Sequence, residues 1–297
     1  MNTLPPLESL FEAEGGSALP LPSDLATLYG RLHLPSHPGR PFVLGNFVTT
    51  LDGVVTLNEP GHASGGDISG FNRHDQLVMG LLRAVADAVI VGAGTLRSVP
   101  QHRWTAQYIY PALAGAYQQL RTSMDKPAPP LNVIVTAHGE VNLDLPVFQS
   151  GEVPVLLVTT THGAERIERI RAERLPPGVR VSALQSAGPL SARAILQAVS
   201  RVRQSDVILV EGGPQLMSDF FAAQALDELF LTLAPQIAGR DAEVERPGLV
   251  MGKRFAPEHP LWGTLISIKR SDSHLFLRYA FPAGEQAEIR ASEHHRE

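Results

Sequence analysis

The chain contains no cysteine among its 297 residues. This absence excludes disulfide bridges, thiolate nucleophiles, iron–sulfur clusters and every zinc site that uses sulfur ligands. It also fits a reducing compartment, so we expect a cytoplasmic protein. No apolar run approaches the roughly 20 residues that cross a bilayer, and residues 1–6 lack the basic start and apolar core of a secretory signal. The sequence therefore predicts a soluble protein with no membrane partner.

An excess of positive charge is also missing. The chain has 25 Lys and Arg against 30 Asp and Glu, which gives a formal net charge of -5. A strongly basic surface for nucleic acid is therefore not expected, and no nucleic-acid partner is predicted. Hydrophobic residues make up 43% of the chain, which is enough for a buried core and excludes a mostly disordered protein.

The first 40 residues differ in composition from the rest. They are rich in Pro and Gly and predict an N-terminal arm with one short helix over 24–32, N-capped by Ser23. From residue 41, apolar runs rich in β-branched residues alternate with helical patterns, which is typical of a parallel sheet with helices on both faces. The predicted strands cover 42–48, 88–91, 131–135, 155–159, 179–184 and 207–210. The predicted helices cover 72–86, 106–124, 164–175, 192–203 and 215–225.

After residue 227 the helical patterns stop. Strands are predicted over 228–233, 261–269 and 275–281, and a polar turn at 271–273 predicts an antiparallel hairpin. The predicted fold is therefore α/β, with a mostly parallel sheet, helices on both faces and a C-terminal antiparallel hairpin in one domain over 41–283. A polar, flexible tail over 284–297 follows. Its two adjacent histidines are too few for a metal site, and no metal is predicted.

Glycines and small hydroxyl residues follow several predicted strands, at the edge where the carboxyl ends of parallel strands meet. Ligands of open parallel sheets bind beyond this edge. Glycine lets backbone N–H groups approach a phosphate, and a following helix adds its positive N-terminal end. Each turn alone is more typical of simple chain reversal, but several together predict a dinucleotide site. The residues are Gly92, Gly94 and Thr95 after one strand, Gly212, Gly213 and Pro214 after another, and Thr136 and Thr159 at two more.

Two acids and one arginine are candidates at the same edge. Asp52 follows the first strand and could orient a substrate or supply a proton, although Asp-Gly is also a common turn pair. Glu211 ends an apolar strand, and its alternative role is to accept N–H groups of the next turn. Arg83 could meet a phosphate or form an exposed salt bridge. The loop over 61–67, which includes Ser64, is equally consistent with a flexible cover and an ordinary surface loop.

Several of these motifs occur together in one known family, and in the same order. They are Thr50-Leu51-Asp52-Gly53, Leu82-Arg83-Ala84, Val91-Gly92-Ala93-Gly94-Thr95, Val210-Glu211-Gly212-Gly213-Pro214, and Asp227-Glu228-Leu229 through Ala234-Pro235 with Gly239. The chain resembles, over about residues 41–281, the reductase domain of the bifunctional riboflavin-biosynthesis deaminase/reductase, a relative of dihydrofolate reductase. The resemblance implies a dihydrofolate-reductase-like fold, NADPH as cofactor and a homodimer. The implied substrate is 5-amino-6-(5-phospho-D-ribosylamino)uracil, whose ribose is reduced to a ribityl chain.

The resemblance also implies roles for single residues. Asp52 and Glu211 are the implied catalytic pair, with Asp52 as the acid near ribose C1′ and Glu211 holding amino or hydroxyl hydrogens. Arg83 is implied to bind the ribose phosphate. We expect the substrate to contact Asn46, Asp52, Ser64, Arg83 and Glu211. We expect the cofactor to contact Thr49, Gly92, Gly94, Thr95, Thr136, Thr159, Gly212, Gly213, Pro214, Gln215 and Leu216.

The chain departs from the family pattern in three places. Val54 stands where many members have a basic residue, and residues 97–100 replace a common Asp-Asp-Pro segment, so Arg97 could instead meet the cofactor's 2′-phosphate. The absence of cysteine excludes the zinc site of the deaminase half, which predicts a stand-alone reductase. Two alternatives stay open: a reductase of another heterocycle such as dihydrofolate, and a non-catalytic NADPH-binding protein of the same fold.

Overall fold

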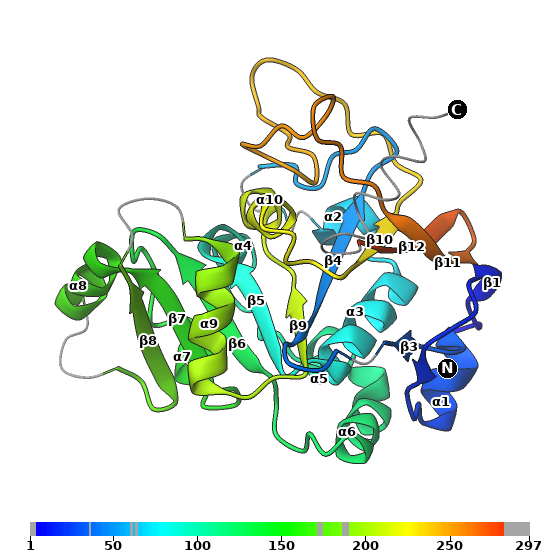
Figure 1. Ribbon diagram of the computed structural model, residues 1–297, viewed down its shortest axis with the longest axis horizontal. Helices are drawn as coiled ribbons and strands as arrows, with labels where there is room; N and C mark the ends of the chain where they lie inside the picture. Colours follow the sequence, from blue (N-terminus) through cyan, green and yellow to red (C-terminus); the bar gives the residue numbers. More distant parts are fainter. Residues whose placement is uncertain are drawn as a thin grey trace.

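The described chain folds around one ten-stranded sheet with the strand order β1-β11-β12-β10-β4-β9-β5-β6-β7-β8 (Figure 1). The computed structural model describes residues 4–35, 37–59, 62, 65–170, 175–185 and 190–281. Ser64 and the predicted tail over 284–297 lie outside these residues. No helix in the described ranges is long and apolar enough to cross a bilayer.

The parallel part of the predicted sheet is confirmed. Its strands pair side by side because runs of Val, Ile and Leu have to be buried on both faces, and all four residues of β9 are buried. The parallel strands are β4 (Phe42–Thr49), β5 (Ala88–Gly92), β6 (Leu131–Thr136), β7 (Val155–Thr160), β8 (Val179–Leu184), β9 (Val207–Val210) and β10 (Glu228–Leu233).

The predicted C-terminal hairpin is confirmed as well. Strand β11 (Thr264–Ser271) pairs antiparallel with β12 (His274–Ala280), and β12 continues the sheet antiparallel to β10. Strand β1 (Glu8–Glu12) then pairs antiparallel with β11 at the outer edge. Strand β1 was not predicted, because all five of its residues are exposed and show no alternation of apolar and polar side chains.

The N-terminal region differs in detail from the prediction. Helix α1 covers Ser23–Tyr29 instead of 24–32, and Pro22 occupies the N-cap position, so the cap assigned to Ser23 is wrong. The short strands β2 (Ser17–Ala18) and β3 (His33–Leu34) pair in a separate two-stranded sheet. Residues 4–35 therefore pack on the domain through α1, β1 and this small sheet.

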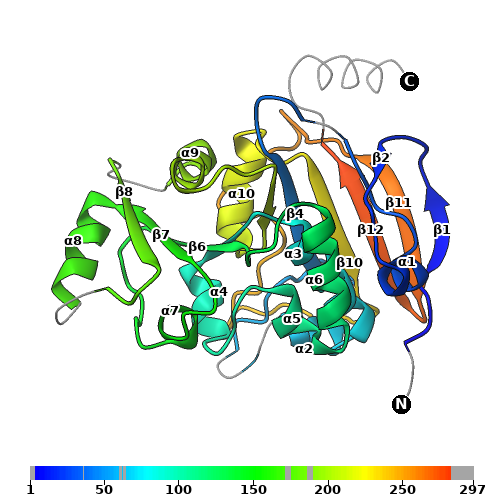
Figure 2. The same ribbon diagram turned by 90° about the horizontal axis from the view of Figure 1, so that it is seen from below.

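Helices cover both faces of the large sheet (Figure 2). One face carries α3 (Arg73–Val85), α5 (Ala106–Ile109), α6 (Ala114–Ser123), α7 (Pro146–Gln149) and α8 (Thr161–Ile170), and the other carries α9 (Ala192–Val202) and α10 (Pro214–Ala222). The short helices α2 (Gly65–Ser69) and α4 (Ala93–Ser98) follow β4 and β5. The helix predicted over 106–124 is interrupted by a 3-10 turn, η1 (Pro111–Leu113), because proline cannot supply the N–H that a continuous helix needs.

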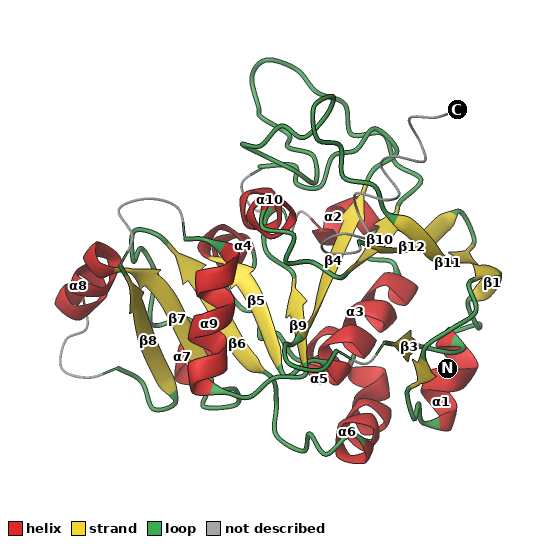
Figure 3. Cartoon of the chain, in the orientation of Figure 1, coloured by secondary structure: helices red, strands yellow, loops and turns green. Residues whose placement is uncertain are grey.

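A long connection without helix or strand joins β10 to β11 over residues 234–263 (Figure 3). It crosses the carboxyl ends of the central strands. Within this connection, the amide of Met251 donates to the Ser218 hydroxyl on α10 at 2.7 Å, and the carbonyl of Pro247 accepts from the amide of Val55 at 3.0 Å. We call residues 234–263 the β10–β11 connection. It contacts α10 on one side and the turn after β4 on the other.

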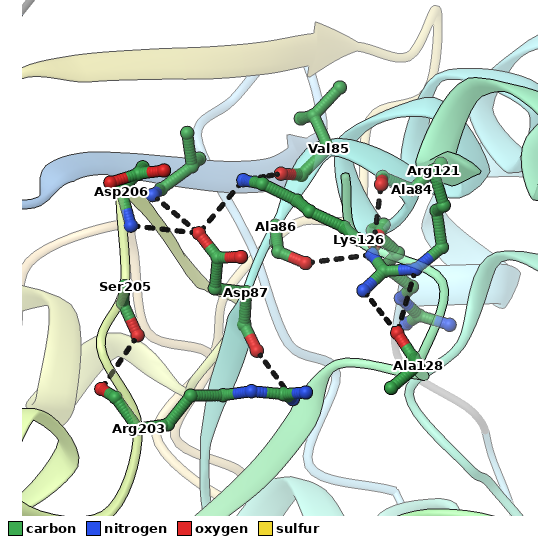
Figure 4. A network of polar contacts seen from close by, with 12 residues as sticks. Ala84, Val85, Ala86, Asp87, Arg121, Lys126, Ala128, Arg203, Ser205 and Asp206 are labelled. Carbon is green, nitrogen blue, oxygen red and sulfur yellow. Dashed lines mark hydrogen bonds and ion pairs between the residues drawn. The ribbon is translucent and has the colours of Figure 1, made fainter. Parts of the chain in front are cut away.

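The amino ends of the central strands are joined by a polar network (Figure 4). The Asp87 carboxylate accepts from Lys126 Nζ at 2.8 Å and from the backbone amides of Asp206 and Val207 at 2.8 and 2.9 Å. Arg121 is 2% exposed and donates to backbone carbonyls at the end of α3 and at Ala128. This network fixes the end of the sheet opposite the glycine turns.

Candidate active site

The two glycine turns predicted from the sequence lie next to each other at the carboxyl edge of the sheet. One begins at Gly92 after β5, and the other includes Gly213 after β9. Because β5 and β9 pair in the sheet, a Cβ atom added to Gly92 would lie 4.0 Å from the backbone nitrogen of Gly213. A Cβ atom added to Gly213 would lie 3.9 Å from the Thr95 hydroxyl. The fold therefore brings both turns and Thr95 to one place.

Helix α10 starts at this place with glycine and proline. Gly213 is its N-cap and Pro214 its first residue, so the free N–H groups of the first turn point out of the edge. Gly212 is needed for packing, because a Cβ atom there would lie 2.3 Å from Leu216 Cδ2. Leu216 is buried beneath the turn, whereas Gln215 is exposed beside it.

The threonines expected to bind a cofactor differ in accessibility. Thr136 ends β6 and is 6% exposed. The Thr49 hydroxyl donates to a backbone carbonyl of the turn after β4 at 3.2 Å, so it closes that turn. Thr159 is fully buried, and a Cβ atom on Gly163 would lie 1.9 Å from its hydroxyl. Thr159 therefore packs against α8 in this structure, and the cofactor contact expected for it stays a prediction.

Glu211 lies directly after β9 and is held from two sides. Its Oε2 accepts from Arg83 Nε at 2.9 Å and pairs with Arg83 Nη2 at 2.8 Å, and its Oε1 accepts from Asn46 Nδ2 at 3.2 Å. Asn46 lies on β4, which is the neighbour of β9 in the sheet. Glu211, Asn46 and Arg83 are thus brought together as expected, although they come from three separate elements.

Arg83 is occupied within the protein. It is 2% exposed, two of its nitrogens face Glu211, and its Nη1 lies 2.8 Å from His102 Nε2. A phosphate would have to displace these partners to reach the guanidinium. In this structure Arg83 fixes the position of Glu211, and the expected contact between Arg83 and a ribose phosphate stays a prediction.

His102 was not expected at the site. Its ring lies against Trp104 and Tyr108, with ring centroids 5.1 and 4.6 Å away. Burial, followed by the nearby charge of Arg83, lowers the pKa of His102 to about 2. The ring is therefore neutral, and its Nε2 accepts from Arg83. The departure from the family pattern near residue 100 was the available signal, but nothing in the sequence joined this segment to Arg83.

Asp52 anchors the β10–β11 connection. Its carboxylate accepts from the Thr50 hydroxyl at 2.5 Å and from the amides of Ala238 and Gly239 at 3.1 and 2.8 Å. These hydrogen bonds, with that of Thr50 the largest cause, lower the pKa of Asp52 to about 2. In this structure the Asp52 carboxylate is a hydrogen-bond acceptor for the turn after β4 and for the β10–β11 connection. The role of Asp52 as the acid near C1′ stays a prediction.

A further acid, Asp75, lies on the same face of α3 as Arg83, two helical turns away. Burial raises the pKa of Asp75 to about 6, against hydrogen bonds from Thr232 and Ser69, and the nearby charge of Glu211 raises it further. Asp75 is 5% exposed. The cluster formed by Asp75, Glu211 and Arg83 thus contains two carboxyl groups and one cation, and it retains a proton below about pH 6.

A cavity of about 450 Å³ adjoins the glycine turns on the side away from Glu211. It starts at Ala93 in the turn after β5 and extends to Ile170 on α8. Its charged lining residues are Arg97, Glu140 and Arg166. The edge therefore has, in the order β4, β9, β5, β6 and β7, the acids, the glycine turns and then this cavity. Among the described residues no group of three or more His, Asp or Glu could hold a metal ion.

Known structures share this fold. A pyrimidine reductase-like protein from Corynebacterium diphtheriae aligns with a TM-score of 0.63 and 21% identity, covering 82% of this chain and 93% of that chain. RibD of Acinetobacter baumannii aligns with a TM-score of 0.60 and 21% identity, covering 82% of this chain and 59% of that chain. The fold and its edge site thus define a dihydrofolate-reductase-like α/β protein.

The sequence comparison gives the family. The model of the RibD C-terminal domain matches residues 41–256, so the chain belongs to the RibD C-terminal domain family. The riboflavin biosynthesis protein RibD of Aquifex aeolicus (strain VF5) is 23% identical over 211 residues, which are 71% of this chain and 51% of that protein. The chain thus spans about half the length of this curated relative.

Proposed function

We propose that the chain is an NADPH-dependent reductase that converts 5-amino-6-(5-phospho-D-ribosylamino)uracil to its ribitylamino product in riboflavin biosynthesis. One observation carries the proposal: the two glycine turns lie next to each other between a cavity on one side and the Glu211 cluster on the other. Membership in the RibD C-terminal domain family supports the reaction class. The name of the curated relative supports a role in riboflavin biosynthesis, and the name of the pyrimidine reductase-like protein supports a pyrimidine as substrate.

The glycine turns fit a dinucleotide pyrophosphate. At Gly92 and Gly213 an added Cβ would be in ordinary van der Waals contact with its nearest atoms, at 4.0 and 3.9 Å, so the glycines leave the volume of one methyl group free beside the backbone. The N-terminus of α10 adds N–H donors and a positive dipole end at the same place. A cofactor bound there would extend one half into the cavity and the nicotinamide half toward Glu211.

The nicotinamide, when bound, supplies a hydride to ribose C1′. Glu211 is paired with Arg83, and its carboxylate is placed to accept hydrogens from the amino and hydroxyl groups of the substrate. Asn46 fixes the rotation of this carboxylate through Oε1. Orientation of the substrate against the nicotinamide is the main contribution of these residues.

The reaction also consumes one proton, and Asp75 is the best source in the cluster. The ring C1′–O4′ bond breaks, O4′ takes the proton, and C1′ takes the hydride, so the carboxyl group of Asp75 ends ionised and is reprotonated from solvent. Glu211 and Asp75 differ in environment, since Glu211 has a paired cation and Asp75 has hydroxyl partners. Two carboxyl groups held in different environments are typical of sites in which one group acts as the acid and the other as the base.

The test is oxidation of NADPH, followed at its absorbance band, with the phosphoribosylaminouracil as substrate. We expect turnover by the wild type and a loss of at least about 10²-fold in the Glu211→Gln variant, with NADPH affinity retained. Asp24→Asn on the exposed face of α1 is the matched control and keeps wild-type turnover. Absence of oxidation, while a known reductase is active in the same assay, would overturn the proposal.

The burial of Arg83 favours a second candidate, the reduction of another heterocycle such as dihydrofolate, because no described contact reserves this guanidinium for a phosphate. Parallel assays with both substrates decide between the two. Binding of NADPH without turnover of either substrate would instead indicate a non-catalytic NADPH-binding protein. We further propose a homodimer, as the family resemblance implies, and light scattering of the purified chain measures this.

A further inference from the structure

The cavity beside the glycine turns has one cation more than it has anions. Arg166 Nη1 pairs with Glu140 Oε1 at 2.9 Å across the cavity wall. Arg97 is exposed in the last turn of α4 and forms no ion pair or hydrogen bond with the part of the chain that the structure describes. Its Nη2 lies beside the turn, 3.9 Å from where a Cβ on Gly94 would be. The lining therefore has a net positive charge next to the proposed pyrophosphate site.

We infer that Arg97 binds the 2′-phosphate of the adenosine half of the cofactor and thereby selects NADPH over NADH. The inference rests on the proposed nicotinamide cofactor, and it assigns recognition of the 2′-phosphate to Arg97. An arginine is suited to this task because its planar donors match two phosphate oxygens at once.

Glu140 offers the opposite specificity, since a carboxylate in this region of a dinucleotide site commonly accepts the ribose 2′-OH of NADH. Two features argue against that use. The Glu140 carboxylate is already paired with Arg166, and Arg97 leaves the cavity with an unpaired positive charge. A 2′-phosphate would neutralise this charge and would also draw on Arg166, which lines the same cavity.

The experiment measures the binding of two adenosine fragments by calorimetry and needs neither substrate nor turnover. Adenosine 2′,5′-bisphosphate and adenosine 5′-monophosphate differ only in the 2′-phosphate. We expect the wild type to bind the bisphosphate at least about 10-fold more tightly, which corresponds to about 1.4 kcal/mol. In Arg97→Ala this ratio falls to near one, because only the bisphosphate loses affinity, and Arg97→Lys restores part of it.

Arg169→Ala is the matched control. Arg169 is an exposed arginine of α8, the helix that carries Arg166, and it is not part of the cavity lining. This variant keeps the wild-type ratio. Equal affinity of the two fragments for the wild type, or an equal loss of both in Arg97→Ala, overturns the inference and leaves the dinucleotide site standing. Failure of the wild type to bind either fragment overturns the cofactor proposal together with the inference.

Discussion

Arg83 and Glu211 meet between α3 and the end of β9, with Nη2 and Oε2 2.8 Å apart and with side chains only 3% and 7% exposed. Two nitrogens of Arg83 converge on the same oxygen of Glu211. The second oxygen is left to Asn46, so the plane of the carboxylate is fixed from both sides. An ion pair this deeply buried is expensive to break by removing one partner.

The first prediction separates the stabilising role of this pair from its role in turnover. Glu211→Gln removes the carboxylate that is paired with the buried Arg83, and we expect a loss of about 3–5 kcal/mol in the free energy of unfolding. The double variant Arg83→Met with Glu211→Leu should regain most of this stability, because both charges are then gone, but it should remain inactive. Urea unfolding and turnover assays measure the two effects. A double variant that is less stable than Glu211→Gln would contradict this account.

A second prediction concerns acid stability and His102. The folded-state pKa of His102 is lowered to about 2. At a pH below the usual pKa of histidine, the unfolded chain therefore binds a proton at this residue, whereas the folded chain does not. This group therefore destabilises the fold increasingly as the pH falls below about 6.5, by about 1.4 kcal/mol per pH unit. His102→Phe retains the aromatic packing and removes this dependence. The difference in unfolding free energy between wild type and variant should change in favour of the variant between pH 6.5 and 4.

The third prediction has the opposite sign and concerns Asp75. Its folded-state pKa is raised to about 6, so ionisation of this carboxyl opposes folding as the pH rises from about 4 to 6. We expect Asp75→Asn to be more stable than the wild type at pH 8, by on the order of 2–3 kcal/mol, and the difference to vanish near pH 4. Unfolding at a series of pH values gives the curve. If Asp75 is the proton source proposed above, the same variant also loses turnover despite its greater stability.

Asp52 gives a fourth prediction, on the β10–β11 connection. Asp52→Ala removes the acceptor for the amides of Ala238 and Gly239, so these amides should exchange hydrogen with solvent faster. Because the pKa of Asp52 is lowered to about 2, the wild-type carboxylate keeps this contact above pH 4 and loses it only as the pH falls toward 2. Hydrogen exchange read by mass spectrometry measures the effect. Unchanged exchange over residues 236–240 would remove the anchoring role.

The fifth prediction concerns Arg121 at the opposite end of the sheet. Its guanidinium donates to the carbonyls of Ala84, Ala86 and Ala128 at 2.9, 2.8 and 2.5 Å, and burial lowers its pKa to about 10 (Figure 4). Arg121→Met leaves these carbonyls unpaired, and we expect a loss of about 2–5 kcal/mol. Binding of the adenosine fragments should not change, because the site lies at the other end of the strands. Arg201→Ala, on the exposed surface of α9, is the control for both measurements.

The sheet was predictable because its central strands are short apolar runs, whose residues leave few alternatives to burial on both faces. The glycine turns were predictable for the same reason, since their position follows from the ends of those strands. Strand β1 was not, because its exposed residues show no alternation and its pairing with β11 depends on residues more than 250 positions later in the chain.

The roles within the site were less predictable than its location. Asp52 was correctly placed after β4, but besides the nearby Thr50 hydroxyl its carboxylate accepts from amides 186 and 187 positions away, which also lower its pKa. Arg83 was correctly placed near Glu211, but its second partner, His102, lies in an irregular segment. Ionisation and availability depend on such long-range contacts, which residue types and spacing do not encode.

The match to the family ends at residue 256, whereas β11 and β12 lie beyond it and β1 lies before residue 41. Three antiparallel strands are therefore joined to β10 from outside the matched region. A fragment trimmed to the limits of the match would leave the backbone amides and carbonyls along one side of β10 without hydrogen-bond partners. Such an exposed edge strand can pair with other chains and lead to aggregation. Strands β1, β11 and β12 thus protect the sheet from aggregation, independently of any ligand.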